Sequence, residues 1–284
     1  GYGIDAQASI LGTFLQDRVG NNTNHKRNTT HRDELTPALF VSWQPMRNVD
    51  WHLNAFTKKA FRMPTFNDLY YTEVGNKYLE PEYTYQYSLS NVWRKAFSKS
   101  LIKSVSLQAD AYFNKVTNKI VAYPSGQQFR WTMLNLGEVE ILGLELAADA
   151  SAKVSDVEMA LRLNYTYQKA RDFTDPSDAY YGDQIPYIPL HSGSVAARMS
   201  WAGWDLNYSF IYTGERYNAQ ENIPTNYEQP WYTHDASLFK NFMLRGVGCR
   251  VGLEVNNIFD QDYEVILNYP MPGRNFKMTF KVNI

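Results

Sequence analysis

Polar and apolar residues alternate regularly along several long segments of the chain. Near the C-terminus every second residue is apolar, at positions Phe276, Met278, Phe280, Val282 and Ile284. A period of two is typical of a β-strand with one apolar face and one polar face. Strands in soluble sandwiches most often have roughly five or six residues, whereas a tilted strand needs about nine to eleven to cross a bilayer. Because the alternating segments here run for ten or more residues, the pattern favours membrane-spanning strands.

About twelve such segments follow one another, joined by connections that alternate in length. The strands are expected at residues 4–16, 35–46, 50–62, 82–95, 103–120, 131–151, 157–170, 188–200, 204–217, 230–242, 247–259 and 274–284. No segment shows a helical period. Transmembrane β-barrels combine short periplasmic turns with long outer loops. The sequence therefore predicts an all-β fold, an antiparallel up-and-down transmembrane β-barrel, whose last strand runs inward and leaves Ile284 periplasmic.

Aromatic residues concentrate at the ends of the expected strands. Tyr83 and Tyr85 begin a strand that descends from a long connection, whereas Trp51, Trp93 and Trp204 lie beside short turns. Side chains with an apolar ring and a polar tip are favoured at membrane–water boundaries. Aromatic residues favour β-sheets in general, but together with strand length and loop asymmetry their placement indicates two interfacial bands.

Composition and charge exclude several classes of protein. The 284 residues include 28 Lys and Arg against 29 Asp and Glu, so no basic excess points to nucleic-acid binding. With 44% hydrophobic residues the chain is too apolar for disorder. The single Cys249 supplies neither an internal disulfide nor a thiolate zinc cluster. No apolar run approaches the roughly 20 residues of a membrane-spanning helix, and we expect any signal peptide to have been removed or to lie on a missing part.

Several short motifs occur in a fixed order along the chain. They are Phe61–Tyr70, Asn76–Glu82, Asn135–Gly137, Gly143–Glu145, Ile185–His191, Asn256–Tyr263 and Pro272–Arg274. In this order they resemble the barrel motifs of TonB-dependent outer-membrane receptors, and the loop at Thr174–Gln184 is similar to that of Bacteroides-type vitamin B12 and siderophore receptors. The resemblance covers nearly the whole chain.

The resemblance implies an organisation and a set of partners. Residues 1–284 are expected to form one β-barrel domain, the C-terminal half of a barrel of about 22 strands, without the plug domain. Implied partners are outer-membrane lipid of a Gram-negative bacterium, the receptor's own plug domain and N-terminal barrel strands, and TonB through the plug. The edges at 4–16 and 274–284 would be unpaired in hydrocarbon, so we expect a companion chain, or closure into a smaller barrel or oligomer.

The implied function is capture and import of a scarce large ligand by the long connections. A corrinoid such as vitamin B12, a ferric siderophore or haem would fit, because phenolic rings can flank a large amphipathic molecule while a few polar groups orient it. The candidate contacts are Arg62, Tyr70, Tyr71, Tyr78, Phe129, Arg130, Tyr180, Tyr181, Tyr187, Tyr217, Tyr227, Trp231 and Tyr269.

Catalytic and metal sites find little support. Four carboxylates that crowd one connection are weak calcium candidates, but their spacing lacks the calcium-loop pattern, and a solvated turn explains them better. These are Asp172, Asp175, Asp178 and Asp183. His25 and His31 share another connection that offers no further ligands. No nucleophile elbow occurs, so neither an enzyme nor a cofactor is expected.

Two other kinds of protein share parts of the pattern. A passive porin would have the same polar lumen, but the receptor motifs would then be coincidental. A soluble β-rich surface module could recognise glycans through its tyrosines, but long apolar strand faces would contact water. The receptor interpretation is therefore preferred to both.

Overall fold

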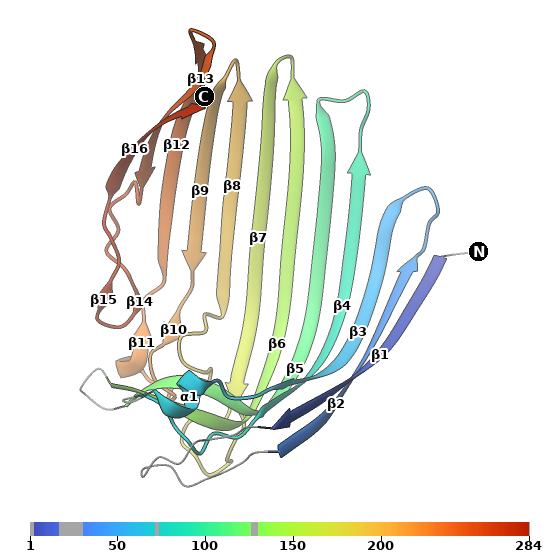
Figure 1. Ribbon diagram of the computed structural model, residues 1–284, viewed down its shortest axis with the longest axis vertical. Helices are drawn as coiled ribbons and strands as arrows, with labels where there is room; N and C mark the ends of the chain where they lie inside the picture. Colours follow the sequence, from blue (N-terminus) through green and yellow to red (C-terminus); the bar gives the residue numbers. More distant parts are fainter. Residues whose placement is uncertain (1–2, 17–30, 72–73, 126–129, 284) are drawn as a thin grey trace.

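A single curved β-sheet dominates the computed structural model, which describes residues 3–16, 31–71, 74–125 and 130–283. Twelve strands follow one another as antiparallel neighbours in a meander (Figure 1). They are β1 (Gly3–Gln16), β2 (His31–Gln44), β3 (Asp50–Arg62), β4 (Glu82–Ala96), β5 (Ile102–Ser125), β6 (Arg130–Val154), β7 (Val157–Asp172), β8 (His191–Trp201), β9 (Trp204–Thr213), β12 (Trp231–Leu244), β13 (Val247–Asn256) and β16 (Asn275–Asn283). The predicted all-β architecture and strand order are confirmed.

Small elements occupy the long connections. They are the helix α1 (Phe66–Tyr70), the 3-10 turn η1 (Pro224–Asn226), and the short strands β10 (Arg216–Tyr217), β11 (Tyr227–Glu228), β14 (Glu264–Ile266) and β15 (Tyr269–Pro270). The helix was not predicted, because five residues are too few to show a helical period. Its only sequence signal is a capping box, in which Thr65 and Asp68 each bond the other's backbone N–H. In the described part of the chain, no helix is long and apolar enough to span a membrane.

Most expected strand boundaries hold, and the differences have local causes. The strand expected at 247–259 ends at Asn256, because Asn257 adopts a φ of 50° and turns the chain. Strands β5 and β6 are longer than expected, at 24 and 25 residues. Their ladder continues from Ile120 opposite Asn135 to Ser125 opposite Arg130. The two strands therefore pair with each other where they extend past the neighbouring strands.

Cross-strand register separates the sheet into a polar and an apolar face, since paired residues share a face. One row joins Ser151, Ala160, Arg198 and Asn207 across β6 to β9, whereas a row on the opposite face joins Ala148, Leu163, Val195 and Phe210. The apolar side chains lack a covering layer. At β13 and β16 the exposed fractions are 56% for Leu253, 72% for Met278 and 63% for Phe280. A soluble sandwich would seal these side chains inside a core, so the fold is that of a barrel wall.

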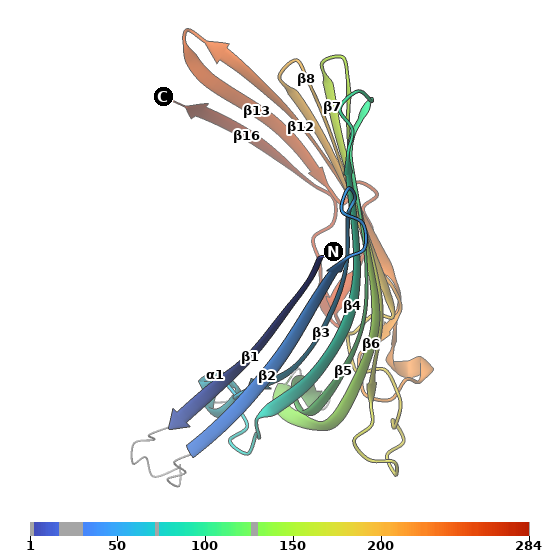
Figure 2. The same ribbon diagram turned by 90° about the vertical axis from the view of Figure 1, so that its right-hand side faces the viewer.

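The sheet is open, and its two edge strands, β1 and β16, lie apart (Figure 2). Strand β1 pairs only with β2, and β16 pairs only with β13, among the residues that the structure describes. One arrangement expected from the sequence was closure of a single copy into a smaller barrel. The sheet is not closed in this way, because β1 and β16 do not pair. Pairing of both edges with other strands stays a prediction.

Candidate ligand-binding loops

The long connections that the structure describes lie at one end of the sheet, here called the long-loop end, and the short turns lie at the other, the short-turn end (Figure 1). The β3–β4 loop lies against β5 and β6. The β7–β8, β9–β12 and β13–β16 loops contact one another and are together called the three-loop cluster; they comprise residues 173–190, 214–230 and 257–274. The candidate contacts therefore fall into two groups.

The β3–β4 loop is braced at its start. Nη2 of Arg62 donates to Oδ2 of Asp68 at 3.3 Å, and Nη1 lies 3.7 Å from Oε2 of Glu82. Partial burial raises the pKa of Asp68, but hydrogen bonds from Thr65 and the charge of Arg62 outweigh it and hold the pKa below the ordinary 3.8. Arg62 thus anchors α1 to the mouth of the sheet.

The rest of this loop is tied to the extension of β5 and β6. The side-chain nitrogen of Asn76 donates to the Met133 carbonyl at 2.9 Å. The Asn135 side chain accepts from the backbone N–H of Glu80 at 2.8 Å and donates to the Glu80 carbonyl at 3.1 Å. The loop backbone is therefore held in place while Tyr71 and Tyr78 remain 61% and 79% exposed.

A small apolar core underlies the neighbouring β7–β8 loop. It is formed by Val116, Leu136, Val139, Ala170 and Ile185. Beside it, the buried Gln184 accepts from the Ala170 N–H at 3.0 Å and donates to the carbonyls of Gln168 and Ile188 at 3.0 and 3.2 Å. Such satisfied, buried polar contacts fix a loop to the strands that carry it.

Asn222 connects the β7–β8 loop to the β9–β12 loop. Its side-chain oxygen accepts from the Gln184 N–H at 2.8 Å, and its side-chain nitrogen donates to the Gln184 carbonyl at 2.9 Å. Its own backbone N–H donates to Oδ2 of Asp183 at 2.9 Å. One asparagine thus makes three bonds between two loops.

Arg216 connects the β9–β12 loop to the β13–β16 loop. It is only 3% exposed, and it donates to the carbonyls of Gln229 at 3.1 Å and Glu264 at 2.5 Å. Burial lowers the pKa of its guanidinium. Nearby, the Tyr187 N–H donates to the Tyr217 carbonyl at 2.8 Å. Tyr187 has a φ of 61°, a conformation that persists only where the surroundings enforce it.

The β13–β16 loop is fastened by residues of the motif Asn256–Tyr263. The Asn257 N–H donates to Oδ1 of Asp235 at 2.7 Å, and its side chain donates to the Gln261 carbonyl at 2.8 Å. Oδ1 of Asp260 accepts from the Arg274 N–H at 2.6 Å. The conspicuous motif residues therefore serve as braces for the loop.

The structure brings several of the candidate aromatic residues together. In the three-loop cluster the rings of Tyr217 and Tyr227 are 6.0 Å apart, and the ring of Trp231, the first residue of β12, lies 4.6 Å from that of Tyr263 in the cluster. Tyr187 belongs to the same cluster, and Tyr269 there is 51% exposed. Sequence reasoning did not select Tyr263, although it ends a recognisable motif, or Arg216, which carries no sequence signal.

The remaining candidates lie in the β7–β8 part of the three-loop cluster, at the start of β6 or near the β3–β4 loop. Tyr181 packs edge-on against Phe173 at 5.3 Å, in the β7–β8 loop. The hydrogen bond to Asp178, with burial and the charges of Asp178 and Asp172, raises the pKa of the neighbouring Tyr180. Arg130 is the first residue of β6, and Phe129 lies outside the described residues. Arg62, the last residue of β3, forms a separate group with Tyr70, Tyr71 and Tyr78 of the β3–β4 loop.

The acidic connection forms turns through its carboxylates. Oδ1 of Asp175 accepts from the backbone N–H and hydroxyl of Ser177 at 2.9 and 2.7 Å, and these bonds lower the pKa of Asp175. Oδ1 of Asp172 accepts from the Thr174 N–H at 2.8 Å. No group of three or more His, Cys, Asp or Glu residues in the described ranges is placed to share a metal ion.

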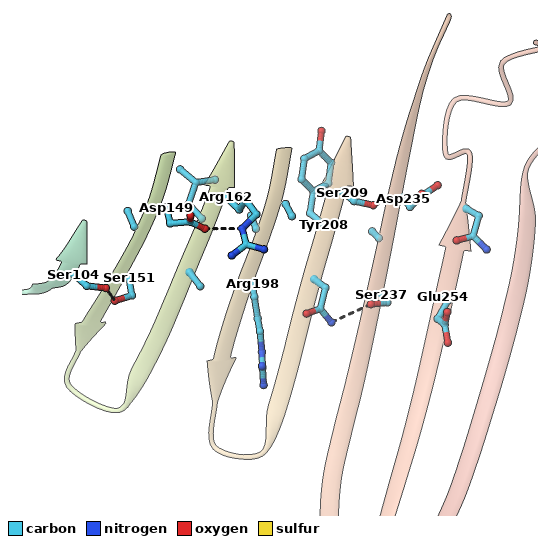
Figure 3. A pocket seen from close by; sticks show the side chains of 18 residues that line it. Ser104, Asp149, Ser151, Arg162, Arg198, Tyr208, Ser209, Asp235, Ser237 and Glu254 are labelled. Carbon is cyan, nitrogen blue, oxygen red and sulfur yellow. Dashed lines mark hydrogen bonds and ion pairs between the residues drawn. The ribbon is translucent and has the colours of Figure 1, made fainter. Parts of the chain in front are cut away.

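Below the loops, the polar face of the sheet lines a hollow of about 610 Å³ (Figure 3). Nε of Arg162 donates to Oδ1 of Asp149 at 2.6 Å. Nη2 of Arg198 lies 2.8 Å from Oδ1 of Asp205, which also accepts from the Ser200 hydroxyl at 2.7 Å. This wall is hydrophilic, with its guanidinium charges compensated.

A polar inner wall, an apolar outer face and long loops at one end define an outer-membrane β-barrel. Residues 12–258 match the family described as TonB dependent receptor-like, beta-barrel, and the chain belongs to that family. Members of this family are outer-membrane proteins of Gram-negative bacteria that bind TonB, a plug domain and ligands such as vitamin B12 or siderophores.

Curated relatives are transporters and receptors. The chain is 27% identical to the vitamin B12 transporter BtuB of Photobacterium profundum over 78% of its length and 33% of the transporter. It is 29% identical to BtuB of Vibrio vulnificus over 79% of its length and 34% of that protein. The chain thus spans about a third of these relatives. The ferrichrome outer membrane transporter/phage receptor of Escherichia coli is 30% identical over 52% of the chain and 19% of that protein.

Solved structures share the fold. The unliganded ferric citrate transporter FecA superposes with a TM-score of 0.72, at 16% identity, over 98% of this chain and 42% of FecA. The siderophore receptor PiuA of Acinetobacter baumannii superposes with a TM-score of 0.69, at 15% identity, over 98% of this chain and 40% of PiuA. At these identities the likeness concerns the fold alone.

Proposed function

We propose that this chain is the C-terminal part of the barrel of a TonB-dependent receptor, and that its long-loop end captures a large ligand for import. A corrinoid such as vitamin B12 is the first candidate, followed by a ferric siderophore or haem. The observation that carries the proposal is a set of exposed rings on loops whose backbones are fixed by buried bonds. Tyr181 and Tyr269 are 43% and 51% exposed, whereas Arg216, which ties two loops of the same cluster together, is 3% exposed.

Fixed loops favour the capture of a scarce ligand. Binding to a mobile loop costs conformational entropy, so a loop that is already ordered binds more tightly for the same contacts. Aromatic rings contribute large contact areas and polar tips at low entropic cost. The bonds of Asn222 and Arg216 provide this order in the three-loop cluster.

Import requires parts beyond the described sheet. We place the polar face toward the plug and water, the apolar face toward outer-membrane lipid, and the C-terminus in the periplasm. Strands β1 and β16 then pair with the remaining barrel strands, which satisfies their free backbone groups. TonB acts on the plug, and movement of the plug releases the ligand along the hydrophilic wall.

The proposal is tested by cyanocobalamin binding to the complete receptor. Tyr181→Ala and Tyr269→Ala remove exposed rings without touching Arg216. Loss of a well-placed ring contact costs more than about 1 kcal/mol, so each variant should weaken the Kd at least about fivefold. Trp201→Phe is the control, because Trp201 is also exposed but lies at the short-turn end. Unchanged affinity in both loop variants would remove these rings from the site.

A further inference from the structure

The three-loop cluster carries a strong excess of negative charge. Its residues 173–190, 214–230 and 257–274 contain nine carboxylates and two guanidiniums, a balance of −7 in a chain whose total is −1. The carboxylates are Asp175, Asp178, Asp183, Glu215, Glu221, Glu228, Asp260, Asp262 and Glu264. Charges gathered at a binding mouth set the potential that an approaching ligand meets.

Neither cation of the cluster can offset this charge for a ligand. Arg216 is 3% exposed and donates to two backbone carbonyls. Nη2 of Arg274 lies 3.8 Å from Oδ2 of Asp260, so its charge is already paired. By contrast, Asp175, Glu221 and Asp262 are exposed. The surface presented to solvent is therefore acidic.

A second, independent observation concerns the buried carboxylate of Asp172, the last residue of β7, whose backbone bonds Gly182 and Asp183 of the β7–β8 loop. Asp172 is 4% exposed, and its Oδ1 accepts from the Thr174 N–H, but Oδ2 has no hydrogen-bond partner among the described residues. A buried carboxylate oxygen without a partner is costly. A hydrogen-bond donor or a cation entering beside it would remove that cost, whereas an anion would increase it.

We infer that the three-loop cluster selects a neutral or cationic ligand that presents N–H donors, and that it rejects polyanionic metal complexes. Corrinoids fit this class, since their rim consists of side-chain amides and their net charge is small. Ferric citrate, a polyanion, does not fit. The inference rests on the proposed function and narrows its ligand class, because repulsion between like charges opposes both encounter and binding.

The test compares three probes on the complete receptor. They are cyanocobalamin as the neutral amide-rich probe, ferrioxamine B as the cation and ferric citrate as the polyanion. Binding is measured at about 20 mM and about 500 mM salt, between which the Debye length falls from roughly 20 Å to roughly 4 Å. We expect binding of cyanocobalamin or ferrioxamine B, with no binding of ferric citrate at low salt.

Charge-neutralising variants sharpen the test. The triple variant Asp175→Asn, Glu221→Gln, Asp262→Asn should weaken ferrioxamine B at least about threefold at low salt and leave it unchanged at high salt. Its control neutralises Asp50, Asp156 and Glu158, at the short-turn end, and should have no effect. If ferrioxamine B does not bind, the affinity for cyanocobalamin is measured instead at both salt concentrations. That affinity should not change with salt, because the ligand is neutral.

The outcomes separate this inference from the proposed function. Ferric citrate that binds as tightly as the neutral probe, or more tightly at low salt, overturns the charge selection while supporting a ligand-capturing receptor. Failure of all three probes to bind or be imported removes the proposed ligand site, and the inference with it. Binding confined to the neutral or cationic probe supports both.

Discussion

The hydroxyl of Tyr165 lies 2.8 Å from Nδ1 of His191, and 43 positions further along the chain Tyr208 and His234 repeat this contact at 2.7 Å. Both pairs bridge neighbouring strands on the apolar face, β7 to β8 and β9 to β12. Two successive strand pairs therefore make the same hydrogen bond between a tyrosine hydroxyl and a histidine ring.

The repetition extends to the polar face of the same strands. Asn164 donates to the Ser194 hydroxyl at 3.1 Å, and Asn207 donates to the Ser237 hydroxyl at 3.1 Å. The two strand pairs share the sequence Leu-Asn-Tyr at 163–165 and at 206–208. Equal spacing thus places equivalent side chains on equivalent faces.

Removing either tyrosine hydroxyl should destabilise the sheet modestly. Tyr165→Phe and Tyr208→Phe each lose one hydrogen bond, worth about 1 kcal/mol. Because the pairs share no partner, the double variant should show nearly the sum of the two effects. Urea unfolding of the complete receptor in lipid provides the measurement, with the exposed Tyr71→Phe as a control. A double variant as stable as the parent would contradict the prediction.

Arg216→Gln should loosen the three-loop cluster. The shorter side chain leaves the Gln229 and Glu264 carbonyls without their charged donor, and hydrogen bonds to charged groups contribute about 1.5–3 kcal/mol each. Hydrogen exchange should accelerate within 214–230 and 257–274 while the β3–β4 loop keeps its protection. Arg245→Gln, in the turn between β12 and β13, is the control. Unaltered exchange in both segments would show that Arg216 does not hold them.

Gly143→Ala should be strongly unfavourable. A Cβ at this position would clash with the ring of Tyr112, which is paired with Gly143 across β5 and β6. The ring must move, and such overpacking typically costs about 1–3 kcal/mol. Tyr112→Ser should relieve the clash, so a double-mutant cycle should show coupling between the two sites. Equal costs of Gly143→Ala with and without the ring would refute the contact.

The start of the β3–β4 loop should depend on pH. The folded-state pKa of Asp68 lies below its ordinary value of 3.8. Its stabilising contribution is therefore present above that value and lost as the pH falls through the lowered folded pKa. Hydrogen exchange at 65–71, corrected for its intrinsic pH dependence, should show the segment opening only at the acid end. Asp68→Asn should abolish this dependence, and persistence of the opening in that variant would assign it to another group.

The alternation of polar and apolar residues was enough to predict most of the strands. Period-two burial is a property of each strand on its own, which is why β3 begins and ends at the expected residues, Asp50 and Arg62. Helix α1 was not predicted, because the capping box of Thr65 and Asp68 is its only signal in the sequence. Aromatic candidates were selected by type and loop membership, and these properties cannot show which loops touch.

The sequence by itself determined the strands, their order, the two faces and the end at which the loops gather, because all of these follow from alternation and connection length. Only the tertiary structure decided that Arg216 is a buried brace, that Asn222 joins two loops, and that Arg62 lies apart from the three-loop cluster. Such contacts join residues distant in the chain. They depend on strand stagger and sheet curvature, which no local pattern encodes.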